Sequence, residues 1–312
     1  EKVYTEEGIY TVTLTVSDTN GEMDTDTLLV DVSNPVGHFG KIADHSIVNI
    51  LRNGDLPESA IQMAKDTLHI GYGHTSHGGQ VTDGMTGLIE FANSGGIGAY
   101  SEDLFAWNSG GLNGALDLSD HGDGELPNDC GYEGWDDHTI NFLNNNTTYN
   151  VIIWSWCGQV SDMDEQEIID EYLNLMEQLE NDDKYQDVVF VYMTGHLDGS
   201  GEEGNLHQRN EQIRAYCEAN DKWLFYFFYI ESYDPDGNYY LDKYANDGCY
   251  YDSDDNGTRD SNWAIDWQEE YTQGEDWYYC NSDHTQTLNS NIKAYASWWL
   301  WARIAGWDGS ID

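Results

Sequence analysis

The first part of the chain shows a strand-like alternation of residue types. Residues 10–16 and 25–32 each alternate β-branched or apolar residues with polar ones, which predicts two strands. The sequence DTNG at residues 18–21 is typical of a hairpin turn between them. We therefore predict an antiparallel strand pair within residues 1–34, followed by a linker at residues 35–40.

From residue 41 onward, short apolar runs alternate with longer segments of helical periodicity. This alternation is typical of a parallel sheet with helices on both faces, so residues 41–312 are expected to form one α/β domain. The apolar runs predict strands at residues 67–72, 104–107, 151–156, 188–193 and 223–230. The helical periodicity predicts helices at residues 80–92, 165–179, 206–219 and 287–305.

Three connections in this domain are long, at residues 94–103, 115–137 and 233–279. Loops of this length are usually functional or stabilised by a metal. The tryptophans of the last predicted helix, Trp298, Trp299 and Trp301, alternate around its axis. Their spacing favours a place in the core over a sugar-binding platform.

Residues 4–18, with the sequence YTEEGIYTVTLTVSD, resemble the C-terminal half of a PKD-type repeat. Such repeats are immunoglobulin-like sandwiches, common on secreted and surface proteins. The resemblance implies a sandwich without its first strands, which leaves a strand edge uncovered. We therefore expect a neighbouring chain or a preceding segment to complete it, and a longer precursor with a signal segment upstream of Glu1.

The charge balance restricts the partners of the protein. Asp and Glu total 58 against 12 Lys and Arg, which gives a formal net charge of -46 at pH 7. This charge repels nucleic acid phosphates and acidic membrane surfaces, so partners should be neutral, cationic or divalent metal ions. No apolar run approaches the roughly 20 residues that cross a bilayer. The need to screen so many carboxylates favours a saline or calcium-containing medium. The resemblance to a PKD-type repeat and the glycosylation sequons at Asn145, Asn146 and Asn256 predict a secreted, extracellular or cell-surface location.

The five cysteines show no CxxC spacing, which argues against a zinc ribbon or a thioredoxin-type site. Cys217 falls in a predicted amphipathic helix and is expected to be a buried free thiol. The other four are expected to form disulfides, with Cys249 and Cys280 as the first pairing to test.

Several polar residues directly follow the predicted strands, where open parallel sheets place their binding sites. Ser76 follows the first strand, among glycines at a helix N-terminus, where the helix dipole favours negative charge. A glycine-rich segment that includes Gly111 follows the next strand and has backbone N–H groups able to approach an oxyanion. Gln159 follows the third strand, and His284 precedes the last helix.

This order of serine, glycine, amide and histidine resembles the SGNH or GDSL-type hydrolase superfamily, over about residues 67–309. The family has a flavodoxin-like, three-layer α/β/α fold and contains esterases and deacetylases that act on acyl groups, often of carbohydrates. The resemblance implies that Ser76 is the nucleophile and His284 the general base. It implies that the Gly111 N–H and the Gln159 side chain are oxyanion donors, with no cofactor required.

The orienting acid of the family pattern is not in its usual place. The family has an aspartate three residues before the histidine, where this chain has Asn281. The site is therefore either a Ser–His dyad or uses another carboxylate to orient the ring. The candidates are the adjacent Asp283 and, from more distant loops, Glu231, Asp198 and Asp234.

The same loops offer candidates for substrate contacts, which are His74, His77, Asn108, His196 and Asp198. An alternative is that His74 and His77 join His196 and Asp198 in a metal cluster, since zinc takes three or four such ligands. The simpler interpretation is that these histidines are loop residues with local hydrogen bonds and that Ser76 caps a helix.

An acidic loop later in the chain has the pattern of a calcium site. Asp252, Asp254 and Asn256 place oxygen ligands at alternate positions before a glycine, as in an EF-hand loop. The twelfth position is Trp263 and not glutamate, so Asp260 is the expected substitute. A structural Ca²⁺ is therefore expected here, against the simpler interpretation of an acidic surface loop.

Three functions are compatible with these features. The first is a secreted serine esterase or deacetylase that acts on acyl esters, with acylated carbohydrate as the first substrate to test. The second is a non-catalytic structural subunit of an extracellular filament or surface layer, which self-associates by completing the partial sandwich between subunits. The third is a calcium-dependent carbohydrate-binding module, which the acidic loops and aromatic residues suggest.

Overall fold

The computed structural model describes residues 8–17, 23–32, 40–98, 100–121, 126 and 128–311 of the chain. The contacts divide it into two compact units, residues 1–40 with 308–312, and residues 41–307.

The first unit contains one antiparallel strand pair. Strand β1 (Gly8–Ser17) pairs with β2 (Met23–Val32), with Gly8 opposite Val32 and Ser17 opposite Met23. The predicted hairpin is confirmed, whereas the predicted turn residues 18–21 lie outside the described residues. Within the described residues these two strands pair only with each other, so both outer edges of the pair are open.

The second unit is built on a seven-stranded parallel sheet with the strand order β3-β9-β8-β7-β4-β6-β5. Its strands are β3 (Ile42–Ala43), β4 (His69–Gly73), β5 (Trp107–Asn108), β6 (Leu116–Asp120), β7 (Val151–Trp154), β8 (Val189–Met193) and β9 (Leu224–Phe225). When β4 is counted first, the middle strands β6-β4-β7-β8-β9 follow the order 2-1-3-4-5, as in flavodoxin-like folds. The chain reverses its direction across the sheet at β4, and ligand sites lie at such switch points.

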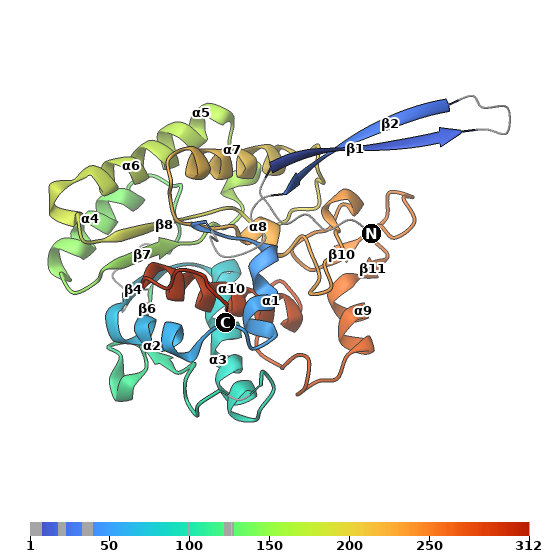
Figure 1. Cartoon of the computed structure of the whole chain (residues 1–312). Helices are drawn as coiled ribbons and strands as arrows, with labels where there is room; N and C mark the ends of the chain where they lie inside the picture. The colour runs from blue at the N-terminus through green and yellow to red at the C-terminus, as the bar shows by residue number, and fades with distance from the viewer. Residues whose placement is uncertain are drawn as a thin grey trace. The chain divides into compact units, whose positions relative to one another are not determined.

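Helices cover both faces of this sheet in three layers (Figure 1). One layer contains α1 (Val48–Arg52), α2 (Glu58–Thr67), α3 (Ser76–Asn93) and α10 (Thr287–Ile304). The other contains α4 (Trp135–Asn145), α5 (Glu165–Ile168), α6 (Asn174–Asn181) and α7 (Asn205–Ala219), with a π-helical segment at Ile169–Leu173 between α5 and α6. The expected α/β fold with a helix-covered parallel sheet is confirmed.

The remaining elements lie mostly in the long C-terminal loop. They are α8 (Phe227–Ile230), α9 (Trp263–Glu270) and the short antiparallel pair β10 (Tyr250–Tyr251) and β11 (Ser261–Asn262). Short 3₁₀ helices occur at His45–Ile47, Leu112–Gly114, Gln159–Ser161, Asp183–Tyr185 and Leu241–Lys243.

Helix α10 forms the centre of the core. Every residue from Leu288 to Ala302 is buried, including Trp298, Trp299 and Trp301, which confirms the core role expected for these tryptophans. The helix crosses α3 so closely that a side chain at Gly84 would overlap the carbonyl oxygen of Ser290. Ser76 is the first residue of α3, and His284 lies just before the first residue of α10. The close crossing of the two helices therefore holds together the segments that carry these two residues.

Two parts of the predicted secondary structure were wrong. Residues 223–230 form only the two-residue strand β9, and the helix α8 follows, because an apolar run alone does not distinguish a buried strand from a buried helix. Strand β6 lies within residues 115–137, which were predicted to form one long loop, and helix α4 begins in the same segment at Trp135.

The expected disulfides are also wrong, because all five cysteines are free. Cys249 Sγ lies 3.2 Å from Thr285 Oγ1, and Cys280 Sγ lies 3.8 Å from Ser282 Oγ. Cys217 is a buried free thiol, as predicted, and burial raises its pKa.

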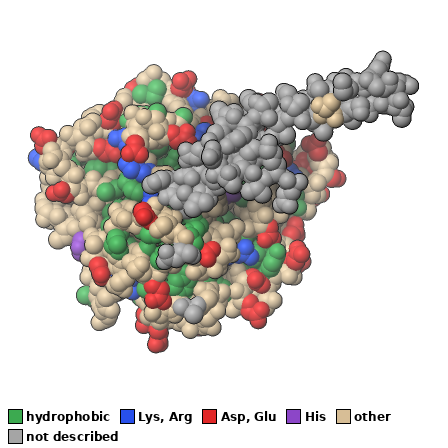
Figure 2. Space-filling model, viewed as in Figure 1, with side chains coloured by type: hydrophobic (Ala, Val, Ile, Leu, Met, Phe, Trp, Pro, Cys, Tyr) green, Lys and Arg blue, Asp and Glu red, His purple; other side chains and the backbone are tan. Residues whose placement is uncertain are grey.

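The surface reflects the acidic composition of the chain. Figure 2 shows Asp and Glu side chains over much of one face, with fewer Lys and Arg among them. Among the helices of the described residues, none is both long enough and apolar enough to span a membrane.

Candidate active site

The structure brings Ser76 and His284 together. Their side chains meet at a distance of 2.8 Å between Ser76 Oγ and His284 Nε2, although they are 208 residues apart in the sequence. Ser76 is the first residue of α3, directly after the loop that leaves β4, and His284 lies just before α10. The serine is half-buried and the histidine exposed, so solvent and small solutes can reach the pair.

The loop that carries Ser76 is held on both sides. The backbone N–H and the hydroxyl of Thr75 donate to the carboxylate of Asp129, at 3.1 and 3.0 Å. On the other side of Ser76, a Cβ atom at Gly78 would lie only 2.5 Å from Ser155 Oγ, after strand β7. The glycine therefore allows the first turn of α3 to approach the neighbouring strand, which fixes the direction of the serine.

The backbone of His284 is held by hydrogen bonds to both of its neighbours. His284 has a left-handed conformation with a φ of 64°, which is uncommon for residues other than glycine. Gln80 Nε2 donates to the carbonyl oxygen of Asp283 at 2.7 Å. Asn289 Nδ2 donates to Thr285 Oγ1, also at 2.7 Å.

A buried ion pair in turn holds these two amide side chains. Lys293 Nζ lies 2.7 Å from Glu231 Oε2, and the two side chains are 0% and 1% exposed. The same ammonium group donates to Gln80 Oε1, and Asn289 Nδ2 donates to Glu231 Oε2 at 3.2 Å. Burial lowers the pKa of Lys293, and the negative charge of Glu231 opposes that effect. The position of His284 therefore depends on one ion pair in the core.

No carboxylate of the described residues lies within 4.0 Å of the His284 ring nitrogens. Asp283 contributes its backbone carbonyl, and its side chain is not paired with the ring. The other candidates, Glu231, Asp198 and Asp234, accept hydrogen bonds from other groups of the chain. Of the two alternatives that the sequence left open, the structure has the Ser–His dyad.

The glycine-rich segment expected to bind the oxyanion is not near the dyad. Strand β5 ends at Asn108, which pairs with Asp117 of β6, and Asp117 pairs with His69 at the start of β4. Ser76 follows the opposite end of β4. The Gly111 N–H instead bonds to the Asn108 carbonyl at 3.3 Å. Gly111 and Asn108 therefore lie at the edge of the sheet away from Ser76, and a different donor must be found.

The first turn of α3 supplies such donors. Its first intrahelical hydrogen bond runs from Gly79 N to Thr75 O, at 3.0 Å. The N–H groups of Ser76, His77 and Gly78 therefore have no partner within the helix. They point out of the helix N-terminus beside Ser76 Oγ, where both the amides and the helix dipole favour an anion.

Gln159 follows strand β7, at the same edge of the parallel sheet as Ser76, and is linked to the neighbouring Thr75 through Asp129. Its side chain hydrogen-bonds to Asp129, which also accepts from Ser155 Oγ at 3.4 Å. Burial raises the pKa of Asp129, and these hydrogen bonds oppose the increase. The other polar side-chain atom of Gln159, Oε1, is buried and has no hydrogen-bond partner among the described residues.

His77 lies in a stack of three histidine rings. Its ring centroid is 3.6 Å from that of His196 and 4.5 Å from that of His284. His77 Nε2 faces Asp247 Oδ2 at 3.2 Å, so His77, His196 and Asp247 form one group that could hold a metal. The ring of His196 is oriented by a contact of 3.0 Å between its Nδ1 and the carbonyl oxygen of Leu197.

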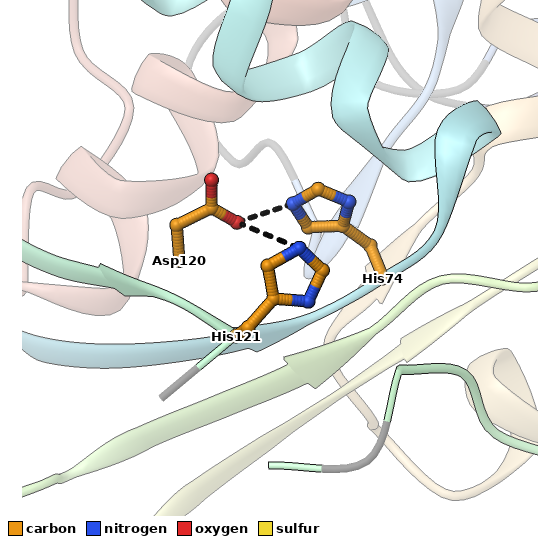
Figure 3. A group of neighbouring side chains, drawn as sticks. All are labelled: His74, Asp120 and His121. Carbon is orange, nitrogen blue, oxygen red and sulfur yellow. Dashed lines mark hydrogen bonds and ion pairs between the residues drawn. The ribbon is translucent and has the colours of Figure 1, made fainter. Parts of the chain in front are cut away.

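A second group contains His74, Asp120 and His121 (Figure 3). The Nε2 atoms of both histidines face Asp120 Oδ1, and the one of His121 lies 3.7 Å from it. His74 and His77 therefore belong to two separate clusters and not to the single cluster considered from the sequence.

Asp198 belongs to neither histidine cluster, because its carboxylate bonds to Ser161 Oγ and to the backbone N–H of Ser200. The sequence analysis did not single out several residues that lie around the dyad, namely Asp120, His121, Asp129 and Asp247. Asp120 and His121 directly follow β6, so recognition of that strand would have drawn attention to them.

The acidic loop expected to bind calcium closes on itself. Asp252 accepts hydrogen bonds from the N–H groups of Asn256 and Gly257, at 3.1 and 2.6 Å, and Asp260 accepts from Ser253 N at 3.2 Å. Within the described residues, Asp252, Asp254 and Asp260 are not gathered into a group of three possible metal ligands. Calcium binding by this loop therefore stays a prediction, which the melting temperature with and without a chelator can test.

Together, the fold and the dyad define an α/β protein with a serine and a histidine paired at the carboxyl end of a parallel sheet, compatible with an SGNH-hydrolase-like fold. Comparisons of the chain with protein-family models, with curated proteins and with solved structures found no match.

Proposed function

We propose that this protein is a serine hydrolase that acts on acyl esters. The observation that carries the proposal is the 2.8 Å contact between Ser76 Oγ and His284 Nε2 at the start of helix α3. A hydroxyl group in contact with a base, beside backbone N–H groups that have no helical partner, is the arrangement that acyl transfer requires.

The residues of the dyad would act in two steps. In the first, His284 Nε2 takes the proton of Ser76 Oγ as the oxygen attacks the ester carbonyl, and the N–H groups at the start of α3 stabilise the oxyanion. The protonated ring then gives its proton to the leaving alcohol, and an acyl-serine remains. In the second step, His284 takes a proton from the water molecule that attacks the acyl group, and the protonated ring then returns this proton to Ser76 Oγ as the acid leaves.

The net charge of the chain limits the substrate. With a formal charge of -46, the protein repels polyanions, so a neutral or cationic ester is favoured. Acylated carbohydrate is the first class to test. An exported location is part of the proposal and rests on the acidic composition and the PKD-like N-terminus, because the cysteines give it no support.

The test combines hydrolysis of p-nitrophenyl acetate with labelling by a fluorophosphonate probe. We expect the wild type to react with both, and Ser76→Ala to lose the label and at least about 10²-fold of its hydrolysis rate. Ser94→Ala, at the other end of the same helix, is the matched control and should keep both activities. A folded wild-type protein that neither hydrolyses the ester nor takes the label would refute the proposal.

A second candidate function is a structural subunit that assembles through the N-terminal strands. It is supported by the open edges of the β1–β2 pair, since an isolated two-stranded sheet is marginally stable in water. Electron microscopy of the full chain over a range of concentrations tests this candidate. Filaments or regular oligomers would support it, and single particles at every concentration would contradict it.

A further inference from the structure

We propose that His74, Asp120 and His121 form a binding site for one divalent transition-metal ion of the Zn²⁺ class. This inference is independent of the proposed hydrolase function, because it concerns residues outside the dyad. The nearest ligand, His74, lies two residues before Ser76 in the chain.

The sheet brings the three residues to one place. Tyr72 of β4 pairs with Asp120 of β6, so the residues that follow these two strands leave the sheet at the same edge. The possible ligand atoms all lie within 4.8 Å of one another. Figure 3 shows both imidazole rings directed at one oxygen of Asp120.

The hydrogen-bonding partners of His74 require a cation at this point. His74 Nδ1 lies 2.8 Å from the carbonyl oxygen of Thr75, which can only accept, so Nδ1 carries a proton. In the neutral ring, Nε2 then has a lone pair that faces the Asp120 carboxylate, which also can only accept. Either a second proton or a metal ion must lie between the two atoms.

The third residue favours a metal ion over a proton. A proton joins two atoms, whereas His121 Nε2 also faces the same oxygen of Asp120, at 3.7 Å. Two ligand atoms of a tetrahedral zinc site are about 3.3 Å apart, as expected from metal–ligand bonds of about 2.0–2.2 Å. The 3.7 Å distance between His121 Nε2 and Asp120 Oδ1 is close to this value. The contact between His74 Nε2 and Asp120 Oδ1 is shorter, and the two atoms would move apart to this distance when the ion binds. The bond from His74 Nδ1 to a carbonyl oxygen is the outer-sphere partner that metal-binding histidines usually have.

The surroundings also favour a cation with free coordination positions. The carboxylates of Asp83 and Asp129 add negative charge close to the three residues: Asp83 interacts electrostatically with His74 and Asp120, and Asp129 with His121. The side chains of Asp120 and His121 are 40% and 38% exposed, so an ion can enter and keep bound water.

The other histidine cluster is less suited to one ion. The rings of His77 and His196 are parallel within 2° and stacked at 3.6 Å. Their lone pairs lie in the ring planes, and lone pairs in two parallel planes do not meet at one point. The rings of His74 and His121 are tilted by 34°, so their planes intersect.

The test is a zinc titration of metal-free protein by isothermal calorimetry, with excess Mg²⁺ present to occupy weak sites on the acidic surface. We expect one tight site in the wild type, and a Co²⁺ visible absorption spectrum that reports nitrogen ligands. Asp120→Asn and His121→Ala should each weaken binding by at least about 10-fold, while near-ultraviolet circular dichroism shows that they are folded.

Two control variants make the result specific. His69→Ala breaks another His–Asp pair on the same two strands, with His69 Nδ1 2.6 Å from Asp117 Oδ2, and should bind zinc as the wild type does. Ser76→Ala should also keep zinc binding, so a failed hydrolase test leaves this proposal standing. The proposal is overturned if folded wild-type protein binds no zinc, or if tight binding survives both Asp120→Asn and His121→Ala; loss of that binding in His77→Ala would then assign the ion to the other histidine cluster.

Discussion

Replacement of Lys293 by methionine tests the dependence of the site on the buried ion pair. The change removes the ammonium group that lies 2.7 Å from Glu231 and keeps most of the side-chain volume. Glu231 is 1% exposed, so its charge would remain in the core, where the described residues give it hydrogen bonds only from Asn289 and the backbone of Leu197. We expect a loss of stability, together with a loss of ester hydrolysis as the segment around His284 loosens.

The size of the effect follows from the burial of the pair. Removal of one partner of a buried ion pair costs about 3–5 kcal/mol of unfolding free energy. Lys222 provides the matched control, since it lies 2.6 Å from Glu180 with side-chain exposures of 22% and 18%. Lys222→Met removes a more exposed pair and should cost no more than about 1 kcal/mol. The double variant Glu231→Gln/Lys293→Met should recover part of the loss, because no charge is left buried.

The assay is urea unfolding followed by tryptophan fluorescence, with the hydrolysis rate measured at a urea concentration where each variant is folded. If Lys293→Met costs no more stability than Lys222→Met, the reasoning about an uncompensated buried charge is wrong. If stability falls and the rate per folded molecule is unchanged, the pair stabilises the core without positioning His284.

Three further predictions concern the site loop, the acid stability and the thiols. Gly78→Ala should lower both the hydrolysis rate and the melting temperature, because the added methyl group meets Ser155, whereas Gly79→Ala has its nearest neighbour at 3.6 Å and should be tolerated. Burial alone would raise the pKa of Glu211, but hydrogen bonds from Arg214 and Tyr226 lower it. The stability that ionised Glu211 contributes is therefore complete above the ordinary glutamate pKa of about 4.3, and it is lost as the pH falls through the lower pKa of the folded state. In urea titrations, the stability difference between wild type and Glu211→Gln should shrink below about pH 4. A thiol reagent should find five reactive cysteines after unfolding without reductant, and a count of one would contradict the free thiols.

The buried strands of the α/β domain could be predicted because both of their faces are covered. Residues 151–154 and 189–193 are almost uninterrupted apolar runs, as parallel sheets require. Strand β6 was missed because three of the five residues in its sequence, LDLSD, are polar, so it does not form an apolar run. Two of them serve neighbouring side chains, since Asp117 pairs with His69 and Asp120 with His74. The local pattern thus failed at a strand that contributes to the candidate metal site.

The pairing of Ser76 with His284 could be predicted because each residue lies at the start of a helix with clear helical periodicity. The expected parallel sheet also implied that the loop carrying Ser76 and the loop carrying His284 lie at the same edge. The position of Gly111 could not be predicted, because it depends on the register of the two-residue strand β5. Lys293 was not noticed, since a lysine in a helix is normally solvent-exposed. Only the three-dimensional structure shows that it has a buried partner 62 residues away.

The complete enclosure of α10 has a consequence for the biosynthesis of the protein. The ribosome makes this helix after every strand of the sheet, yet α1, α2 and α3 all pack against it. Until residue 304 has emerged, the nascent chain lacks the helix that α1, α2 and α3 contact in the native state. The α/β domain must therefore reach its native state after translation of the domain is complete, and a premature stop shortly before residue 287 would leave a chain without a core to fold around.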